Sequence, residues 1–247
     1  MDKFNEHLSA KVIVFACSMY NIQHTVTPVN GKLQVKLECE RPDVEIRYTM
    51  DGKEPTDRSL LYKSPLMVTG TQTIKCTTYR AGRQMGKTLT LPLVWNKATA
   101  KPVLGNTQAG KILVNGIRGS LRQSDFEWHS WESSDSVAFT IDLQKKESLR
   151  SVSVGCITNY GMAAHKPADI EVWVSNDNRD YRKVSGKQFT DGEIFREGTF
   201  KEDVVLDLNK EIGRYVRIIA KGAGECPATH VRPRQEARIY FDEVMIE

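Results

Sequence analysis

The run Trp128-His129-Ser130-Trp131 holds the side chains best suited to recognising a ligand. An indole face stacks on apolar surfaces such as the face of a sugar ring, and imidazole nitrogens exchange hydrogen bonds with hydroxyl groups. A tryptophan at such a position also serves as a core residue. The run therefore predicts either a stacking site for a ring-shaped ligand or, at Trp128, an aromatic part of the core.

The sequence offers little for catalysis. The acidic pair Asp242–Glu243 follows a strand-like run, and in an extended strand its two side chains point to opposite faces. Glycoside hydrolysis needs two carboxyl groups that face one sugar, which this arrangement does not provide. The chain also lacks a Ser-His-Asp order, a glycine-rich phosphate loop and a His-x-x-x-His spacing. We expect no catalytic activity and a structural role for the acidic pair.

The cysteines are widely spaced, at positions 17, 39, 76, 156 and 226, with no Cys-x-x-Cys pair. This spacing predicts neither a zinc site nor a dense disulfide framework. Cys39, Cys76 and Cys156 fall on the apolar phase of strand-like runs. We expect these three to act as small buried hydrophobic residues.

Composition is that of a globular protein with no obvious charged partner. Charged residues make up 27% of the 247 residues, and the net charge of +4 is spread along the chain, which does not favour nucleic-acid binding. No run of eighteen apolar residues predicts a membrane span. The apolar run "VIVFACSMY" follows an acidic and polar start, so no targeting signal is expected in this chain.

The first half of the chain reads as a short helix followed by strands. Phe4, Leu8, Val12 and Phe15 have helical spacing within residues 1–20. Short alternating runs come next, separated by turn pairs such as Asn-Gly and Asp-Gly, as in an antiparallel sandwich. These runs are "LQVKLEC", "VEIRYTM", "TIKCTTY" and "TLTLPLV".

The second half begins after a segment rich in proline and glycine, and we place the domain boundary near Ala98. Its runs "VAFTIDL", "DIEVWVS" and "RYVRIIA" alternate like half-buried strands. The last run, "RIYFDEVMIE", changes phase between Phe241 and Val244, which predicts a β-bulge. A second sandwich is therefore expected.

Both halves resemble known domain families. The stretch that begins with "EIRYTMDGKEPT" and extends to residue 88 is similar to the C-terminal sandwich domain of family-20 β-N-acetylhexosaminidases. The second half resembles a discoidin, or factor-5/8 type C, module of the kind also used by family-32 carbohydrate-binding modules. That resemblance rests on six elements in order: "LVNGIRGS", "WHSW", "FTIDL", "PADIEVWVSNDNRDYRKV", "RYVRIIA" and "FDEVMIE".

The resemblance implies an all-β fold of two β-sandwiches in tandem. The first is immunoglobulin- or fibronectin-like and spans 23–97, and the second is a discoidin-like jelly roll spanning 98–247. Residues 1–22 resemble a linker helix that leaves a catalytic barrel, which would lie upstream of Met1.

The resemblance also suggests where a sugar would bind. His129 matches the histidine that bonds the sugar in family-32 modules, with Trp128 and Trp131 beside it. Galactose-binding members place an arginine in the next loop, whereas this chain does not, so galactose specificity does not carry over. The remaining candidates lie on two later loops. These candidates are Asn159, Tyr160, His165, His230 and Arg232. For His230 and Arg232, the alternative to sugar binding is that they are solvated loop charges.

Many such modules also hold one structural calcium ion. The resemblance places it at Asn115, Ser120 and Glu243. An amide oxygen at Asn115 would be a weaker ligand than the carboxylate usual there. The resemblance therefore allows one structural calcium ion, and we expect no other cofactor.

The chain is thus interpreted as a non-catalytic accessory region of a β-N-acetylhexosaminidase. Its expected partners are glycans containing N-acetylhexosamine or galactose and the enzyme's own catalytic domain, in a secreted, periplasmic or cell-surface parent protein. Two alternatives stay open: a structural buttress that binds no sugar, and an independent adhesion module. An exposed Trp131 beside an open groove would favour sugar binding, and a filled loop end would favour the buttress.

Overall fold

The computed structural model describes residues 18–105, 108–131 and 136–247. The chain forms two compact units, Met1–Trp95 and Asn96–Glu247, and the expected boundary near Ala98 falls just inside the second. The helix expected at 1–20 lies outside the described residues except at its end. Among the described residues, no helix is both long and apolar enough to span a membrane.

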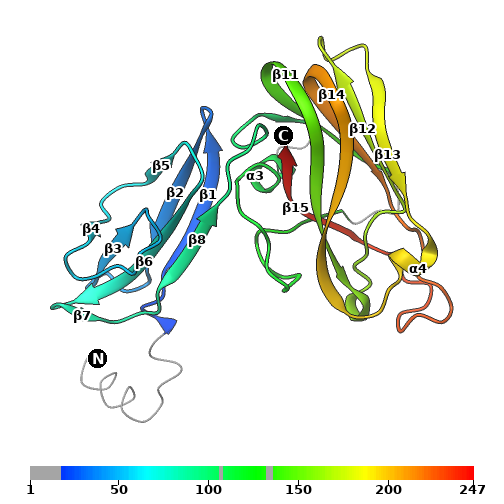
Figure 1. Ribbon diagram of the computed structural model, residues 1–247. Helices are drawn as coiled ribbons and strands as arrows, with labels where there is room; N and C mark the ends of the chain where they lie inside the picture. Colours follow the sequence, from blue (N-terminus) through cyan, green and yellow to red (C-terminus); the bar gives the residue numbers. More distant parts are fainter. Residues whose placement is uncertain (1–17, 106–107, 132–135) are drawn as a thin grey trace. The chain divides into compact units, whose positions relative to one another are not determined.

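The first unit is a sandwich of two antiparallel sheets. One sheet has the order β1-β2-β5, and the other has the order β4-β3-β6-β7 with β8 also paired to β6 (Figure 1). The strands are β1 (Gln23–Val29), β2 (Lys32–Glu38), β3 (Glu45–Thr49), β4 (Leu60–Leu61), β5 (Leu66–Val68), β6 (Gln72–Arg80), β7 (Arg83–Gln84) and β8 (Leu89–Leu93). In β2, Leu33, Val35 and Leu37 are buried and alternate with more exposed residues, as the sequence predicts.

The Asp51-Gly52 pair ends β3 in a tight turn. Gly52 has a φ of 77°, which a residue with a Cβ adopts only with strain, and Asp51 Oδ1 accepts a hydrogen bond from the Lys53 backbone N–H. Glu54 pairs with Lys75 on the neighbouring strand. These acidic residues therefore have structural contacts that account for their presence.

The second unit is built on one sheet with the order β10-β15-β11-β14-β12-β13, with β9 paired to β11. Two short α-helices and a 3-10 turn lie in its connections. The elements are β9 (Val103–Leu104), α3 (Ala109–Ile112), β10 (His129–Trp131), β11 (Ser136–Asn159), η1 (Tyr160–Met162), β12 (Asp169–Ser175), β13 (Arg182–Gln188), α4 (Asp191–Ile194), β14 (Thr199–Lys221) and β15 (Ile239–Ile246).

The long strands β11 and β14 carry this sheet across both layers of a sandwich. They pair antiparallel along their length, with a register irregularity between Asp142 and Glu147 where the ladder bends (Figure 1). On one side of the bend, β11 pairs with β9 and β14 pairs with β12. On the other side, β11 pairs with β15. One core joins residues of both halves, including Phe139 and Phe241, so the two halves pack face to face.

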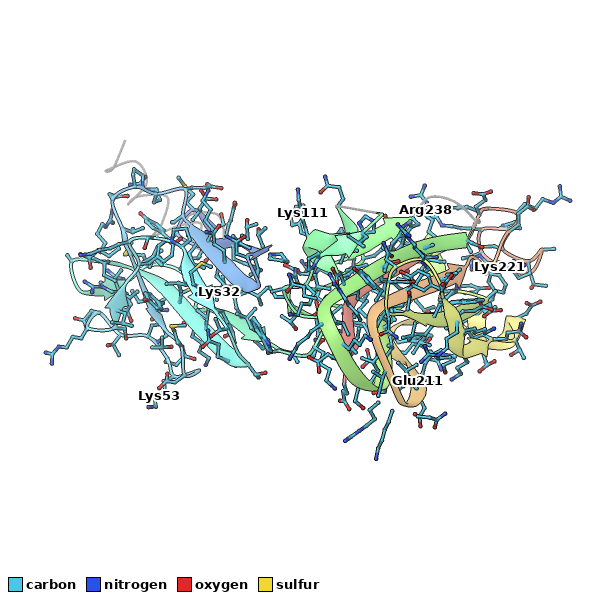
Figure 2. The ribbon with its side chains drawn as sticks, turned by 90° about the horizontal axis from the view of Figure 1, so that it is seen from above. Lys32, Lys53, Lys111, Glu211, Lys221 and Arg238 are labelled. Carbon is cyan, nitrogen blue, oxygen red and sulfur yellow. The ribbon has the colours of Figure 1, made fainter. Side chains whose placement is uncertain are left out.

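The bend gathers several loops at one end of this sandwich. Asn159 pairs with Thr199, and Asp169 pairs with both Lys221 and Gln188. The bend folds the ladder over, so its two ends, at Ser136 paired with Lys221 and at Asn159 paired with Thr199, both lie away from the bend and carry these loops. We call the segments 159–168, 189–198 and 222–238 the loop end. Figure 2 labels Lys221, which precedes the last of these segments, Arg238, which ends it, and Glu211, near the bend.

The β-bulge expected near the end of the chain is present. Val154 pairs with Val244 and Cys156 pairs with Phe241, so two residues of β15 oppose one residue of β11. The two residues of β15 at the bulge are Asp242 and Glu243, and both are fully buried. Of the cysteines expected in the core, Cys76 and Cys156 are buried, whereas Cys39 is only half-buried.

Candidate functional site

The Trp-His-Ser-Trp run spans the entry to β10, where Trp128 belongs to a small core. Its side chain packs with Ile157, Ala164 and Tyr240, and its indole N–H donates to the Ser120 carbonyl at 2.9 Å. Only 6% of Trp128 is exposed. The assignment of Trp128 to a sugar-stacking role is therefore corrected to the core alternative, because its ring faces are covered by protein.

His129 and Trp131 point to the same side of β10, since they are two residues apart in a strand. Trp131 stacks on Phe139 with centroids 6.1 Å apart and meets Phe241 edge-on, so it packs against the main core. His129 lies edge-on to Trp131 at 4.4 Å, and desolvation lowers the pKa of this half-buried imidazole. Trp131 is thus not the exposed platform that would most favour sugar binding.

At the loop end, His165 and His230 form a buried pair. Their Nε2 atoms are 3.2 Å apart, and each residue is almost fully buried. Tyr160 covers His230 with a ring separation of 3.8 Å. A sugar hydroxyl cannot reach either imidazole in this arrangement, so the expected sugar-bonding roles of His165 and His230 are corrected. Arg232 stays exposed and donates to the Gly161 carbonyl through Nε.

The second unit also has an open groove with a volume of about 510 Å³. Of the expected ligand-binding residues, only Asn159 lines it, and the Asn159 side-chain amide makes no hydrogen bond within the described residues. Gln123 contributes a buried Oε1 that also has no hydrogen-bond partner there. The full lining is Leu121, Arg122, Gln123, Ser124, Asn159, Met162, Thr199 and Tyr240.

The loop before Trp128 has no distinctive motif in the sequence, although it supplies half of the groove lining. It also carries Phe126, whose side chain is the most exposed large hydrophobic of the described residues at 93%. Leu121 and Met162 are apolar and exposed as well. The sequence feature that indicates this loop is a single aromatic residue, Phe126, in the polar stretch "RQSDFE" next to Trp128.

The expected calcium residues fall into two groups. Glu243 is completely buried, its Oε2 accepts the Gly116 N–H at 3.0 Å, and its Oε1 has no hydrogen-bond partner among the described residues. Desolvation raises the pKa of Glu243 well above its ordinary value. Asn115 is the residue before Gly116, so it lies beside this carboxyl. Ser120 instead makes turn contacts, because its Oγ accepts the Arg122 N–H and its carbonyl accepts the Trp128 indole N–H.

A carboxylate that the sequence did not single out lies beside Asn115. The Asn115 Nδ2 donates to Glu127 Oε2 at 2.7 Å, while its Oδ1 accepts the Ile117 N–H. Oxygen ligands of this kind suit a hard cation such as Ca²⁺. Asn115, Glu127 and Glu243 are thus the oxygen-bearing side chains here that could hold a calcium ion, and Glu127 offers a carboxylate next to the asparagine at 115.

The fold and this groove define a tandem β-sandwich protein whose second sandwich presents a ligand-sized hollow beside its loop end. The sequence model of the F5/8 type C domain family matches residues 97–232, more than half of the chain, and the chain belongs to that family. The model of the chitobiase/β-hexosaminidase C-terminal domain matches residues 27–90. Both matches agree with the families expected from the sequence, and both describe accessory rather than catalytic domains.

Solved structures give more distant similarities. The chain is similar to CpGH89CBM32-6 produced by Clostridium perfringens (17% identity, 51% of this chain and 81% of that chain, TM-score 0.32). It is also similar to the C-terminal domain of a chitobiase from Bacteroides fragilis (10% identity, 53% and 76%, TM-score 0.32). A third is a Streptococcus pneumoniae fucose binding module (18% identity, 62% and 94%, TM-score 0.39). No curated protein sequence matches the chain significantly.

Proposed function

We propose that this chain is a carbohydrate-binding accessory region that holds a β-N-acetylhexosaminidase on glycans containing N-acetylhexosamine or galactose. The observation that carries the proposal is the order of the two domains: a chitobiase/β-hexosaminidase C-terminal domain is followed directly by an F5/8 type C domain. In the proposed parent protein the first domain would pack near the catalytic part, and the second would contact the substrate surface. The parent protein would then act outside the cytoplasm, where such glycans lie.

The groove has the chemistry that a sugar requires. Leu121, Met162 and Tyr240 give it apolar surface for the face of a pyranose ring. Asn159 and Gln123 offer hydrogen-bonding groups that lack partners within the described residues, and Arg122 adds donors. Gln123 lines the groove but its Oε1 is buried, so its amide would have to turn toward a sugar hydroxyl, and that contact would remove the cost of leaving the oxygen unpaired.

A structural calcium ion belongs to the same proposal. Asn115, Glu127 and Glu243 would hold it. The ion would then bind the buried Glu243 carboxyl, whose Oε1 has no hydrogen-bond partner within the described residues. The loop 117–128 starts from this cluster, so the ion would fix the loop that lines half of the groove. Ser120 remains a predicted ligand, and its hydrogen bonds within the described residues go to the turn and to Trp128 rather than to this cluster.

The test of sugar binding is a titration of the chain with oligosaccharides of N-acetylglucosamine and N-acetylgalactosamine, followed by amide NMR shifts. A shallow groove with few polar contacts should bind with a Kd between about 10 µM and 1 mM. Gln123→Ala removes one hydrogen bond and should weaken binding about tenfold. Gln144→Ala, at the bend on the opposite end of the same sandwich, is the matched control and should leave the affinity unchanged.

The shifts should map to the groove residues. The proposal fails if no shifts appear at millimolar sugar, which favours the buttress, or if they map to the first unit. If the amide signals of this chain shift on addition of a partner protein or a lipid vesicle but not of sugar, the adhesion alternative is favoured.

A further inference from the structure

Three side chains with metal-binding atoms meet inside the loop end: His165, Cys226 and His230. Their ligand atoms all lie within 4.8 Å of one another, and all three residues are buried. His165 follows η1, whereas Cys226 and His230 come from the segment between β14 and β15. The sequence alone does not reveal this cluster, because the third residue is distant from the Cys-x-x-x-His pair and no Cys-x-x-Cys pair is present.

The separation of the two imidazoles fits a tetrahedral ion. Zn²⁺–N bonds of about 2.0–2.1 Å place two tetrahedral nitrogen ligands about 3.3 Å apart. The His165 and His230 Nε2 atoms are 3.2 Å apart. A set of two imidazoles and one thiolate suits Zn²⁺ better than it suits Ca²⁺ or Mg²⁺.

One of the ligands is already oriented for a metal. The His165 Nδ1 lies 3.0 Å from the Ile194 carbonyl, which can only accept, so Nδ1 carries the proton and the Nε2 lone pair points into the cluster. Phe195 packs edge-on to His165 at 5.0 Å. The surrounding rings shield the cluster from bulk solvent and lower the local dielectric constant, which strengthens coordination.

Without an ion, the two imidazoles satisfy each other. The His230 Nδ1 accepts the Arg232 backbone N–H at 3.0 Å, so its proton is on Nε2 and is donated to His165 Nε2. An ion would take the place of that bridging proton. His230 would then carry its proton on Nδ1 and lose the Arg232 hydrogen bond, while the Cys226 thiol would release one proton to solvent.

We propose that His165, Cys226 and His230 form a binding site for a zinc-class divalent ion, with a fourth position for water. The ion would tie the segment 222–238 to the segment 159–168, and so fix two of the three segments of the loop end. This proposal concerns a site outside the groove lining and does not depend on sugar binding.

The first experiment uses the full chain and Zn²⁺ alone. Zinc should bind with one ion per chain when measured by competition with a chromogenic chelator. Because one thiol proton is released, the affinity should rise about tenfold per pH unit across the neutral range. Tyr160 packs on His230, and the charged Arg232 side chain lies close to the same imidazole.

The second experiment replaces Zn²⁺ with Co²⁺, whose absorption reports its ligands. A thiolate gives a strong near-ultraviolet charge-transfer band, whereas imidazoles alone do not. Cys226→Ser should abolish this band and weaken zinc binding about 100-fold or more. Cys39→Ser is the matched control, since Cys39 lies in the first unit and is half-buried, and it should retain both.

The outcomes separate clearly. Zinc binding with a thiolate band that is lost in Cys226→Ser and kept in Cys39→Ser supports the site. Failure of the wild type to bind Zn²⁺ at micromolar concentration overturns it, and so does binding without a thiolate band. The wild-type spectrum decides this even if Cys226→Ser does not fold. Sugar titration of the zinc-free chain is separate and addresses the groove alone.

Discussion

The two units treat polar and charged side chains in opposite ways. In the described part of the first unit, the buried polar residues are only Thr77 and Thr78. Its charges pair at the surface, as Asp43 does with Arg41 and Arg80. The second unit buries ionisable groups throughout: His165, Lys166, His230, Asp242 and Glu243.

This difference teaches where a ligand is accommodated. Burying an ionisable group costs free energy unless a partner, a proton or an ion compensates. The described part of the first unit avoids this cost. The second unit keeps a carboxyl with an unpaired oxygen and a neutral imidazole pair, and such perturbed groups cluster at functional sites.

The largest expected effect is the loss of a buried ion pair in the second unit. Asp242 Oδ2 accepts hydrogen bonds from Arg118 Nε at 2.9 Å and from the Gly119 N–H at 3.0 Å. Asp242→Asn removes the charge from this fully buried site and should lower the free energy of unfolding of the second unit by about 3 kcal/mol.

The matched variant Asp43→Asn lies on the surface of the first unit and should change stability little, because water screens its pairs. Urea denaturation, followed by amide signals assigned to each unit, measures both. Equal losses in the two units would contradict the contrast drawn between them.

The next effect is a pH dependence that belongs to His165. Burial lowers its pKa to about 4, from an ordinary value of 6.5. Between these values the unfolded chain binds the proton and the folded chain does not, so stability is complete above pH 6.5 and is lost as the pH falls toward 4. The loss should reach about 3 kcal/mol at most.

The measurement is urea denaturation between these pH values with a chelator present, so that no metal ion interferes. His165→Gln should show a shallower pH dependence than the wild type over this window. An identical slope in both proteins would mean that His165 titrates as freely in the folded chain as in the unfolded one.

Calcium should act through Glu243. The raised pKa of Glu243 means that the ion-free folded chain loses stability as the pH rises from its ordinary value of 4.5 toward the higher folded value. Calcium binds only the ionised carboxyl and reverses this loss. At free calcium 100 times Kd the gain is about 2.7 kcal/mol.

Thermal unfolding with calcium or with a chelator measures this gain. Glu243→Gln removes the ligand charge and should abolish the difference between the two conditions. Gln144→Ala, at the bend, should keep it. A calcium effect that persists in Glu243→Gln would place the ion elsewhere.

The strands and the bulge could be predicted from the sequence because they depend on local alternation. The phase change between Phe241 and Val244 is visible in the order of residues, and the structure has the bulge there. The match to two domain families was equally accessible, since "IRYTMDGKEPT" and the six later elements lie in short continuous stretches.

The ligand-binding residues were less predictable because their roles depend on burial. Histidine and tryptophan suit both a ligand site and a core, and only the fold shows that Trp128, His165 and His230 are covered. The groove is lined in part by Gln123, from a loop, and Asn159, at the end of β11, and neither residue type signals a ligand site before the fold brings them together. Long-range register is not readable from a single sequence.

The smallest effect concerns the Asp51-Gly52 turn of the first unit, where only local backbone strain is at stake. Gly52 has a φ of 77°, and an added Cβ would meet Thr73 at an ordinary 3.5 Å, so Gly52→Ala should cost about 1 kcal/mol through strain alone. Gly70→Ala is the control, because an added Cβ there meets nothing within 4 Å and the backbone is not left-handed. Urea denaturation of the first unit should show a loss for Gly52→Ala and none for Gly70→Ala. Equal stability of the two variants would mean that the hydrogen bond from the Lys53 N–H to Asp51 holds the turn without help from glycine.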